Sequence, residues 1–441
     1  MFLHGTSRVN GRGHLEIGGC DTTELAHTYG TPLYIYDEAL IREKCRAYVK
    51  AFEESGFRFQ VAYASKAFMC IAMCQLIAEE NMSLDVVSSG ELYTALKAGF
   101  PAERIHFHGN NKTEDELKMA LDAGIGCFVV DNFFELELLH DLAQKEERIV
   151  SILLRLTPGI EAHTHEYIST GQDDSKFGFG VASGQALQAV KRALDKPFYK
   201  LLGIHSHIGS QIFETTGFIG AIEVLGEFLE QVRTETKYEI EVLNLGGGFG
   251  IRYTAEDDPL PVSKYVQVIT EEVRRQFTAR NYPLPEIWIE PGRSIVGEAG
   301  TTLYTVGAIK DIPGIRKYVA IDGGMSDNIR PALYQAKYEA MLANRADEPA
   351  AEVVSIAGKC CESGDMLIWD YALPKAEPGD LLAVSCTGAY GYSMANNYNR
   401  IRRPAVVFVK DGRADVAVKR ESYEDLVRND RVIVCALSQS V

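Results

Sequence analysis

The chain has 441 residues, of which 46% are hydrophobic and 24% are charged, and its formal net charge is −16. This length predicts two or three domains around a large core. The negative charge excludes nucleic acid and anionic membranes as expected partners, so an anionic substrate must be attracted by local arginines.

The cysteines and the N-terminal segment favour a reducing, cytoplasmic location. The nine cysteines are an odd number without a C-x-x-C pair, which indicates neither a disulfide framework nor a zinc ribbon. The N-terminal segment MFLHGTSRVNGRGHLEIGG lacks the apolar core of a signal peptide, and no apolar run reaches the roughly 18 residues of a membrane span.

From about residue 37, short β-branched or aromatic runs alternate with segments of helical spacing. This alternation predicts a parallel sheet covered by helices. Eight strand candidates favour a TIM-type (β/α)8 barrel, with an open doubly wound sheet as the alternative because spacing does not prove closure. The candidates are residues 59–64, 84–88, 105–109, 127–131, 150–156, 201–208, 241–247 and 287–292.

Polar residues three positions before a glutamate predict capping boxes at three helix starts. One connection, 157–182, is long and rich in polar residues and glycine, which predicts a functional loop or lid. The three pairs are Ser88 with Glu91, Thr113 with Glu116, and Asn132 with Glu135, and the first two helices are predicted to stop at Gly99 and Gly124.

After Gly297 the pattern predicts an all-β region, a sandwich or barrel-like domain that the N-terminal segment completes with a strand. We therefore expect a barrel domain over 37–298 and a β domain formed by 1–36 and 299–441. The predicted strands are 302–309, 317–321, 351–357, 380–385 and 404–412.

Several candidate site residues follow barrel strands, at the edge where such barrels place their active sites. Lys66 ends the first strand, where a lysine can bind an aldehyde cofactor covalently, although a solvated lysine is the commoner interpretation. Gly246, Gly247 and Gly248 can turn backbone N–H groups toward an anion, but a lone G-G-G more often marks a tight turn.

Glu290 and Arg293 lie three residues apart across a Pro-Gly turn and can face one pocket, or form a surface ion pair. Such an arginine can bind phosphate, and such a glutamate can hold a proton on a pyridine nitrogen. His205 and His207 have strand spacing on the sixth strand, and His163 and His165 form a second pair. Without thiolates or an HExxH motif, we expect no metal site.

These segments in this order resemble the fold-type III, alanine-racemase-fold family of pyridoxal-phosphate-dependent decarboxylases, and within it the diaminopimelate decarboxylases. The resemblance covers nearly the whole chain. The motifs are YASKA, LDVVSSGEL, FHGNNKT, HTHEYISTGQDDSKFGFG, HSHIGSQI, LNLGGGFG, EPGRSIVG, DGGMSDNIRPALYQAKYEA, CCESGD and TGAYGYSM.

The resemblance implies pyridoxal 5'-phosphate as cofactor and decarboxylation of meso-2,6-diaminopimelate to L-lysine, the last step of lysine biosynthesis. It implies that Lys66 binds the cofactor, His207 stacks on its ring and Glu290 pairs with its nitrogen. The phosphate would be surrounded by Ser210, Gly246, Gly247, Gly248, Gly292, Arg293 and Tyr390, and the substrate held by Arg293, Arg330, Tyr334 and Tyr390.

The resemblance also implies a homodimer in which Cys361 and Glu362 enter the neighbouring subunit's site. Cys361 would donate the proton that replaces the carboxyl group, and Glu362 would bind the distal amino-acid end. The adjacent Cys360 leaves open which thiol faces the site.

Specific sequence features disfavour the alternative functions. Related decarboxylases of ornithine, arginine or carboxynorspermidine are disfavoured by Glu362, Arg330 and Tyr334, and a racemase by the CESGD segment. An inactive regulatory homologue should have lost Lys66, Glu290 or Cys361, and a cofactor carrier would be a shorter, single barrel.

Overall fold

A computed structural model describes residues 1–160 and 174–433 and contains a closed barrel of eight parallel strands. Pairing of β8 with β9 closes the barrel, which confirms the predicted TIM-type architecture and rejects an open sheet. In order round the barrel, the strands are β5 Phe59–Ala64, β6 Ser83–Val86, β7 Ile105–Phe107, β8 Cys127–Val130, β9 Val150–Thr157, β11 Tyr199–His205, β12 Val242–Asn244 and β13 Glu286–Ile289.

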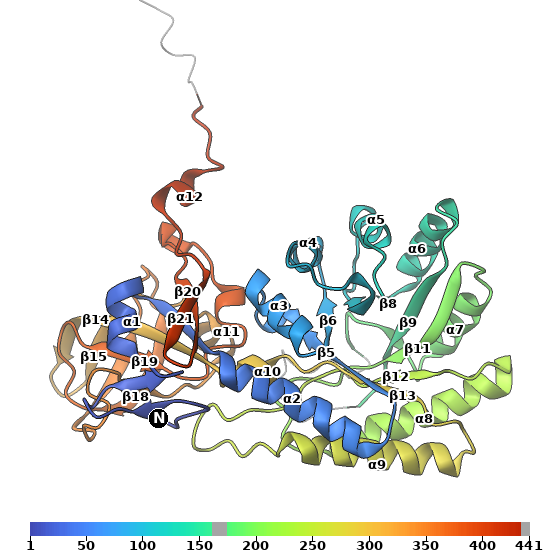
Figure 1. Cartoon of the computed structure of the whole chain (residues 1–441), viewed down its shortest axis with the longest axis horizontal. Helices are drawn as coiled ribbons and strands as arrows, with labels where there is room; N and C mark the ends of the chain where they lie inside the picture. Colours follow the sequence, from blue (N-terminus) through green and yellow to red (C-terminus); the bar gives the residue numbers. More distant parts are fainter. Residues whose placement is uncertain (161–173, 434–441) are drawn as a thin grey trace, which may run out of the picture.

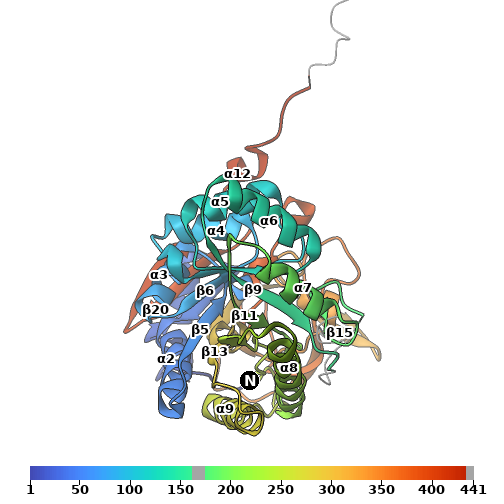
Figure 2. The same ribbon diagram turned by 90° about the vertical axis from the view of Figure 1, so that its right-hand side faces the viewer.

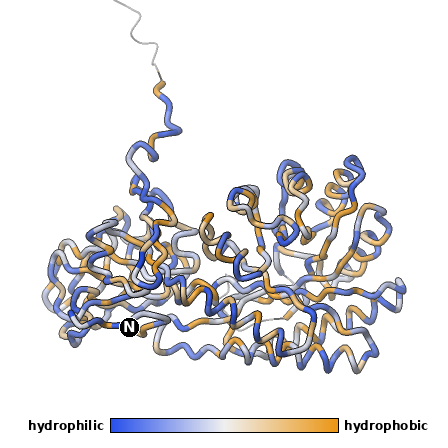
Figure 3. Tube along the Cα trace, viewed as in Figure 1, coloured by the Kyte–Doolittle hydropathy of each residue, from blue (hydrophilic) through white to orange (hydrophobic). Residues whose placement is uncertain are grey.

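Helices surround this barrel, as the view in Figure 2 shows. Their apolar faces pack against the outward-facing side chains of the strands in one large core, and Figure 3 shows hydrophilic and hydrophobic residues alternating along the helices. The helices are α2 Glu38–Ser55, α3 Ile71–Glu79, α4 Ser89–Lys97, α5 Glu114–Ala123, α6 Phe133–Lys145, α7 Gln185–Leu194, α8 Thr216–Thr236 and α9 Val262–Ala279.

Only one of the three predicted capping boxes is complete. Thr113 and Glu116 bond reciprocally at the start of α5, which ends at Gly124 as predicted. Ser88 and Asn132 cap their helices, but the glutamates bond one residue further back, to the N–H groups of Val87 and Asp131. The strand preceding each of these helices is thereby fastened to the helix's first turn.

A second sheet lies beside the barrel, on the left of Figure 1. The N-terminal strand β4 Leu33–Asp37 pairs with β14 and β20 at its centre, as expected of the N-terminal segment. The other strands are β14 Gly300–Ile312, β15 Arg316–Ile321, β16 Ala340–Leu342, β17 Glu352–Ala357, β18 Met366–Leu373, β19 Leu381–Val384, β20 Ala405–Lys410 and β21 Arg413–Val418.

β16, β18 and β21 were not predicted from the sequence, and β14 is longer than the predicted 302–309. A three-stranded sheet of β1 Arg8–Val9, β2 Leu15–Ile17 and β3 Cys20–Asp21, followed by α1 Thr22–Tyr29, packs on this region. After β21 the short helix α12 Tyr423–Val427 projects from the body of the molecule in Figure 1.

The connection predicted over 157–182 contains a short parallel strand, β10 Phe179–Gly180, which pairs with β9. Residues 161–173 of this connection, including His163 and His165, lie outside the described residues. Within the described ranges, no helix is long and apolar enough to cross a membrane.

The barrel interior has its own apolar cluster, separate from the core beneath the helices. Side chains of β8, β9, β12 and β13 meet there, although β8 and β12 are not neighbours in the sheet, so these side chains must point inward. The cluster consists of Cys127, Val129, Leu153, Val242 and Trp288.

We expect Leu153→Ala to lower the free energy of unfolding by about 2 to 5 kcal/mol, because it opens a cavity in this closely packed layer. Denaturant unfolding of the variant and the parent measures the difference. Ile149→Ala, one residue before β9 and 67% exposed, is the control and should change stability by less than about 0.5 kcal/mol. Equal stabilities of the two variants would contradict the inward packing.

Candidate active site

A polar layer lies directly above the apolar layer inside the barrel. Side chains two residues apart on a strand share a face, so each inward apolar residue is followed by an inward residue nearer the strand's carboxyl end. The pairs are Val129 and Asp131, Leu153 and Arg155, Val242 and Asn244, and Trp288 and Glu290. Strand periodicity therefore places charged groups at the edge where barrel enzymes bind substrate.

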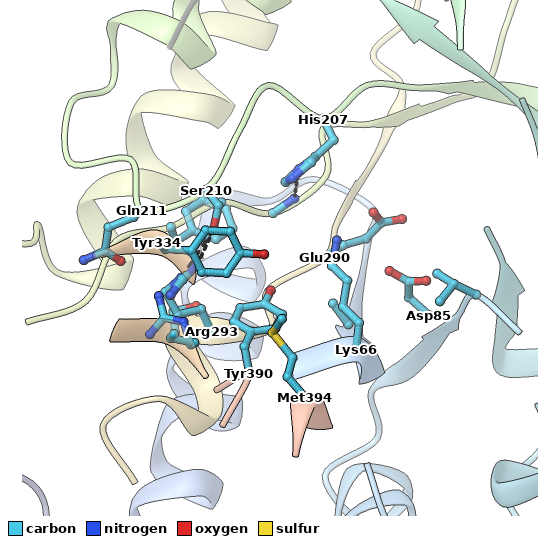
Figure 4. Close-up of a pocket in the computed structure, with 18 of the residues that line it drawn as sticks. Lys66, Asp85, His207, Ser210, Gln211, Glu290, Arg293, Tyr334, Tyr390 and Met394 are labelled. Atoms are coloured by element: carbon cyan, nitrogen blue, oxygen red, sulfur yellow. Dashed lines mark hydrogen bonds between the residues drawn. The ribbon is translucent and has the colours of Figure 1, made fainter. Parts of the chain in front are cut away.

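A cavity of about 710 Å³ opens above this layer and is lined by residues of both the barrel and the second sheet's connections. Figure 4 labels ten of the residues that line this cavity and shows them converging on it. Of the residues singled out from the sequence, the cavity brings together Lys66, His205, His207, Ser210, Gly247, Gly248, Glu290, Gly292, Arg293, Arg330, Tyr334 and Tyr390.

Lys66 lies in a 3-10 turn, η1 Ser65–Ala67, directly after β5. Both of its neighbours are fixed: the Ser65 hydroxyl donates to the Asp85 carbonyl at 2.5 Å, and the Ala67 carbonyl accepts from the Tyr390 N–H at 2.8 Å. The rigid turn directs the Lys66 side chain into the cavity (Figure 4). A covalent attachment point for an aldehyde is therefore positioned by the backbone.

Glu290 is a buried carboxylate at the cavity floor with three donors around it. Asn244 Nδ2 donates at 2.7 Å to Oε1, and His205 Nε2 lies 3.0 Å from Oε2. His108 Nε2 lies 2.8 Å from Oε1, and its ring packs edge-on against His205. These contacts exclude the alternative of a surface ion pair for Glu290.

Burial alone raises the pKa of Glu290, but the adjacent His108 and His205 together hold that pKa well below its usual range. Burial lowers the pKa of His205 to about 4, whereas Asp85 and Glu290 outweigh burial at His108 and raise its pKa. Glu290 therefore remains an ionised acceptor that faces the cavity.

His207 lies beyond the end of β11, so the expectation that it shares the strand with His205 is wrong, although both line the cavity. Its Nδ1 accepts from the Gly247 N–H at 3.2 Å, which leaves Nε2 to carry the proton of the neutral ring. Burial lowers the pKa of His207 well below its usual range. A neutral, oriented imidazole is suited to lie against an aromatic ring.

The glycine turn after β12 forms a cradle without side chains. A Cβ on Gly247 would lie 2.1 Å from the Glu290 carbonyl oxygen, and one on Gly248 would lie 2.3 Å from that of Gly209. Gly246 does not line the cavity, and its N–H donates to Asn244 instead. Glycine is therefore required at both positions, because the backbones approach each other closely where this turn borders the cavity.

Arg293 begins the short helix α10 Arg293–Val296 next to this cradle. Its Nη2 donates to Ser210 Oγ at 2.8 Å, shown dashed in Figure 4, and its guanidinium lies 4.9 Å from the centre of the Tyr390 ring. A backbone N–H group, a hydroxyl and a guanidinium are donors that suit a phosphate. The residues present therefore fit the phosphate of pyridoxal phosphate.

Two buried arginines lack a carboxylate partner among the described residues. Arg293 is 6% exposed and Arg330, at the start of α11 Arg330–Tyr334, is 7% exposed, and neither forms an ion pair. Both instead donate to the hydroxyl of Tyr253, at 2.5 and 3.1 Å. Because burying a guanidinium without an anion is costly, the pair indicates an anionic ligand.

Several residues of this site were missed from the sequence: Asp85, His108, Arg155, Tyr253 and Tyr338. The period-two pattern could have found Arg155, which follows Leu153 by two positions at the end of β9. His108 stands in the FHGNNKT motif, but no spacing rule connects it with Glu290. Tyr253 and Tyr338 come from separate loops, and only folding brings them to the arginines.

Cys361 and Glu362 do not line the cavity of their own chain. Cys361 is exposed, and its N–H donates to Asn399 at 2.7 Å, whereas Cys360 is buried. Burial raises the pKa of Cys360 to about 11. Asp365, from the same CCESGD segment, accepts from the N–H groups of Met325 and Cys360 and holds the loop's shape.

His108, His205 and Glu290 come close enough to hold a metal ion, with ligand atoms within 4.8 Å of one another. No metal site was expected from the sequence, in which these three residues are far apart. Glu290 is already bonded by Asn244 and His205, so the cluster is held together without an ion.

Comparison with known proteins agrees with this geometry. Residues 38–297 match the family model "Pyridoxal-dependent decarboxylase, pyridoxal binding domain". The chain is 63% identical to the diaminopimelate decarboxylase of Halalkalibacterium halodurans, over 98% of this chain and 99% of that protein. It is also 63% identical to the Bacillus subtilis enzyme of the same name, over 98% of both chains.

A solved structure gives the same result. The crystal structure of M. jannaschii diaminopimelate decarboxylase in co-complex with L-lysine is 38% identical to this chain, with a TM-score of 0.91, and the match covers 98% of this chain and 99% of that one. Sequence, fold and cavity agree: the chain belongs to the diaminopimelate decarboxylase family of pyridoxal-dependent decarboxylases.

Proposed function

We propose that this protein decarboxylates meso-2,6-diaminopimelate to L-lysine with pyridoxal 5'-phosphate as cofactor. The observation that carries the proposal is the pair of buried guanidiniums, Arg293 and Arg330, in the same cavity as Lys66. The cofactor phosphate beside Arg293, and a substrate that keeps a second carboxylate beside Arg330, would neutralise them. The relatives named diaminopimelate decarboxylase support the same substrate.

The cavity provides a separate contact for each end of the cofactor. Lys66 would bind its aldehyde carbon, the Gly247–Gly248 turn with Ser210 and Arg293 would hold its phosphate, and Glu290 would accept a hydrogen bond from its ring nitrogen. When bound, pyridoxal phosphate supplies an electron sink for the pair released as carbon dioxide leaves. An ionised Glu290 keeps the proton on that nitrogen and so strengthens the sink.

His207 would lie against one face of the cofactor ring and fix its plane, while Gly292 leaves space beside Lys66. The distal carboxylate would be held by Arg330, with Tyr334 and Tyr390 closing the cavity around the substrate. Tight positioning matters because the leaving carboxylate must stand perpendicular to the ring for its electrons to be accepted.

A second subunit would complete the site. We propose that the barrel domain, 37–298, binds the cofactor, and that the β domain, 1–36 and 299–441, presents Cys361 and Glu362 to the partner in a homodimer. Exposed Cys361 is accessible for this role, whereas Cys360 is buried. Cys361 would donate a proton to the carbon that lost its carboxyl group, and Glu362 would bind the distal ammonium group.

The proposed activity is tested by carbon dioxide release from the protein loaded with pyridoxal phosphate. Meso-diaminopimelate, L-ornithine and L-arginine are offered side by side. We expect release from diaminopimelate alone, with L-lysine formed in equal amount. Release from another amino acid instead would keep the fold and cofactor but contradict the proposed substrate.

We expect Lys66→Ala to abolish covalent attachment of the cofactor, because Lys66 follows β5 directly and lines the cavity together with Gly292 and Glu290. Turnover should fall by about 1,000-fold or more, as for loss of a covalent catalyst. The check is the visible absorbance band of the attached cofactor, with borohydride trapping followed by mass spectrometry. Lys97→Ala, on the exposed side of α4, is the control, and trapping at any residue other than Lys66 would contradict the assignment.

The shared site predicts complementation between two impaired variants. Lys66→Ala and Cys361→Ala chains, coexpressed with different tags, should form mixed dimers with one intact site. Random pairing then restores about a quarter of the parent activity, because half of the dimers are mixed and each has one competent site of two. Lys66→Ala with Glu290→Gln is the control and should restore nothing, since both residues belong to one chain's cavity. No recovery in the first pair would exclude a shared site.

A further inference from the structure

The hydroxyl of Tyr253 lies between the two buried arginines of the cavity. Its oxygen accepts from Arg293 Nη1 at 2.5 Å and from Arg330 Nη1 at 3.1 Å. The two guanidiniums lie 5.7 and 5.1 Å from the centre of its ring, so they also meet the negative potential of the aromatic face. Tyr253 is thus a neutral group that joins two like charges.

This arrangement leaves the proton of Tyr253 directed elsewhere. A phenolic oxygen has two lone pairs and one hydrogen, and both lone pairs are engaged by the arginines. Among residues 1–160 and 174–433, none accepts a hydrogen bond from this hydroxyl, and Tyr253 lines the cavity. An acceptor bound in the cavity can therefore take this proton.

Tyr338 provides an internal comparison. Its hydroxyl accepts from the same Arg330 Nη1 at 2.5 Å, and its ring packs edge-on against Tyr253 at 5.5 Å. Tyr338 is 3% exposed and does not line the cavity. Tyr338 can hold Arg330 in place but cannot reach a ligand in the cavity. Tyr253 contacts the same arginine and also lines the cavity, so it can contact a ligand.

We propose that Tyr253 is a specificity-determining residue that binds the distal carboxylate of the substrate through its hydroxyl, together with Arg330 and Arg293. Both arginines donate to its oxygen, which polarises the O–H bond and strengthens its donation to an anion. The proposal rests on the function proposed above. It specifies which group binds the distal carboxylate, which distinguishes diaminopimelate from simple diamines and their precursors.

The test compares L-lysine, which keeps this carboxylate, with cadaverine, the same chain without it. Dissociation constants for both are measured by calorimetry on the cofactor-loaded parent and on Tyr253→Phe. We expect the variant to bind L-lysine about tenfold more weakly, the loss of one hydrogen bond to a charged group, and to bind cadaverine unchanged. The KM for diaminopimelate should rise by a similar factor, with kcat changed by less than about threefold.

Tyr338→Phe is the matched control, because it removes a hydrogen bond to the same guanidinium outside the cavity. It should weaken L-lysine binding by less than about threefold. An equal loss in both variants would show that Tyr253 only supports Arg330, and equal weakening of L-lysine and cadaverine would show a general disturbance; either result overturns the proposal. So does a fall in cofactor affinity of Tyr253→Phe that accounts for the whole effect.

The outcome is distinguishable from failure of the proposed function. If the parent protein releases no carbon dioxide from diaminopimelate, that function is wrong whatever Tyr253 does. If the parent is active and Tyr253→Phe binds L-lysine as the parent does, only the role of Tyr253 is wrong.

Discussion

The buried carboxylate of Glu290 is the constraint on which the site depends. A lone ionised carboxylate inside a barrel is costly, and here three donors from other strands and their loops offset that cost: His108, His205 and Asn244. Each donor stands on a different strand or directly after one, so the barrel must close correctly for the charge to be tolerated. The contacts that stabilise the charge of Glu290 therefore form only in the correctly closed barrel.

The cationic half of the site has a different origin. Arg293 starts a helix that follows the last barrel strand, whereas Arg330 starts one between strands of the second sheet. They meet in the cavity that the barrel and the connections of the second sheet line together. Tyr253 keeps the two arginines together without neutralising them, so the site remains ready for an anion.

Local sequence signals and the structure differ where a residue outside the local pattern makes the deciding contact. The glutamates expected to complete capping boxes at Ser88 and Asn132 accept instead from Val87 and Asp131, which directly follow β6 and β8. β18 was missed because its mixed sequence MLIWDYAL shows neither clean alternation nor a continuous apolar run, and its pairing with β17 decides its conformation.

The sequence by itself determined the alternation of strands and helices, the reactive lysine at a strand end, the glycine turn and the EPGR segment, because each depends on residues close together in the chain. The ordered motifs named twelve of the residues that line the cavity. Barrel closure, the donors around Glu290, and the meeting of Tyr253 and Tyr338 with Arg330 were decided only by tertiary structure. These contacts join segments far apart in the chain. The distances between them depend on how the two sheets pack, which the spacing of nearby residues does not determine.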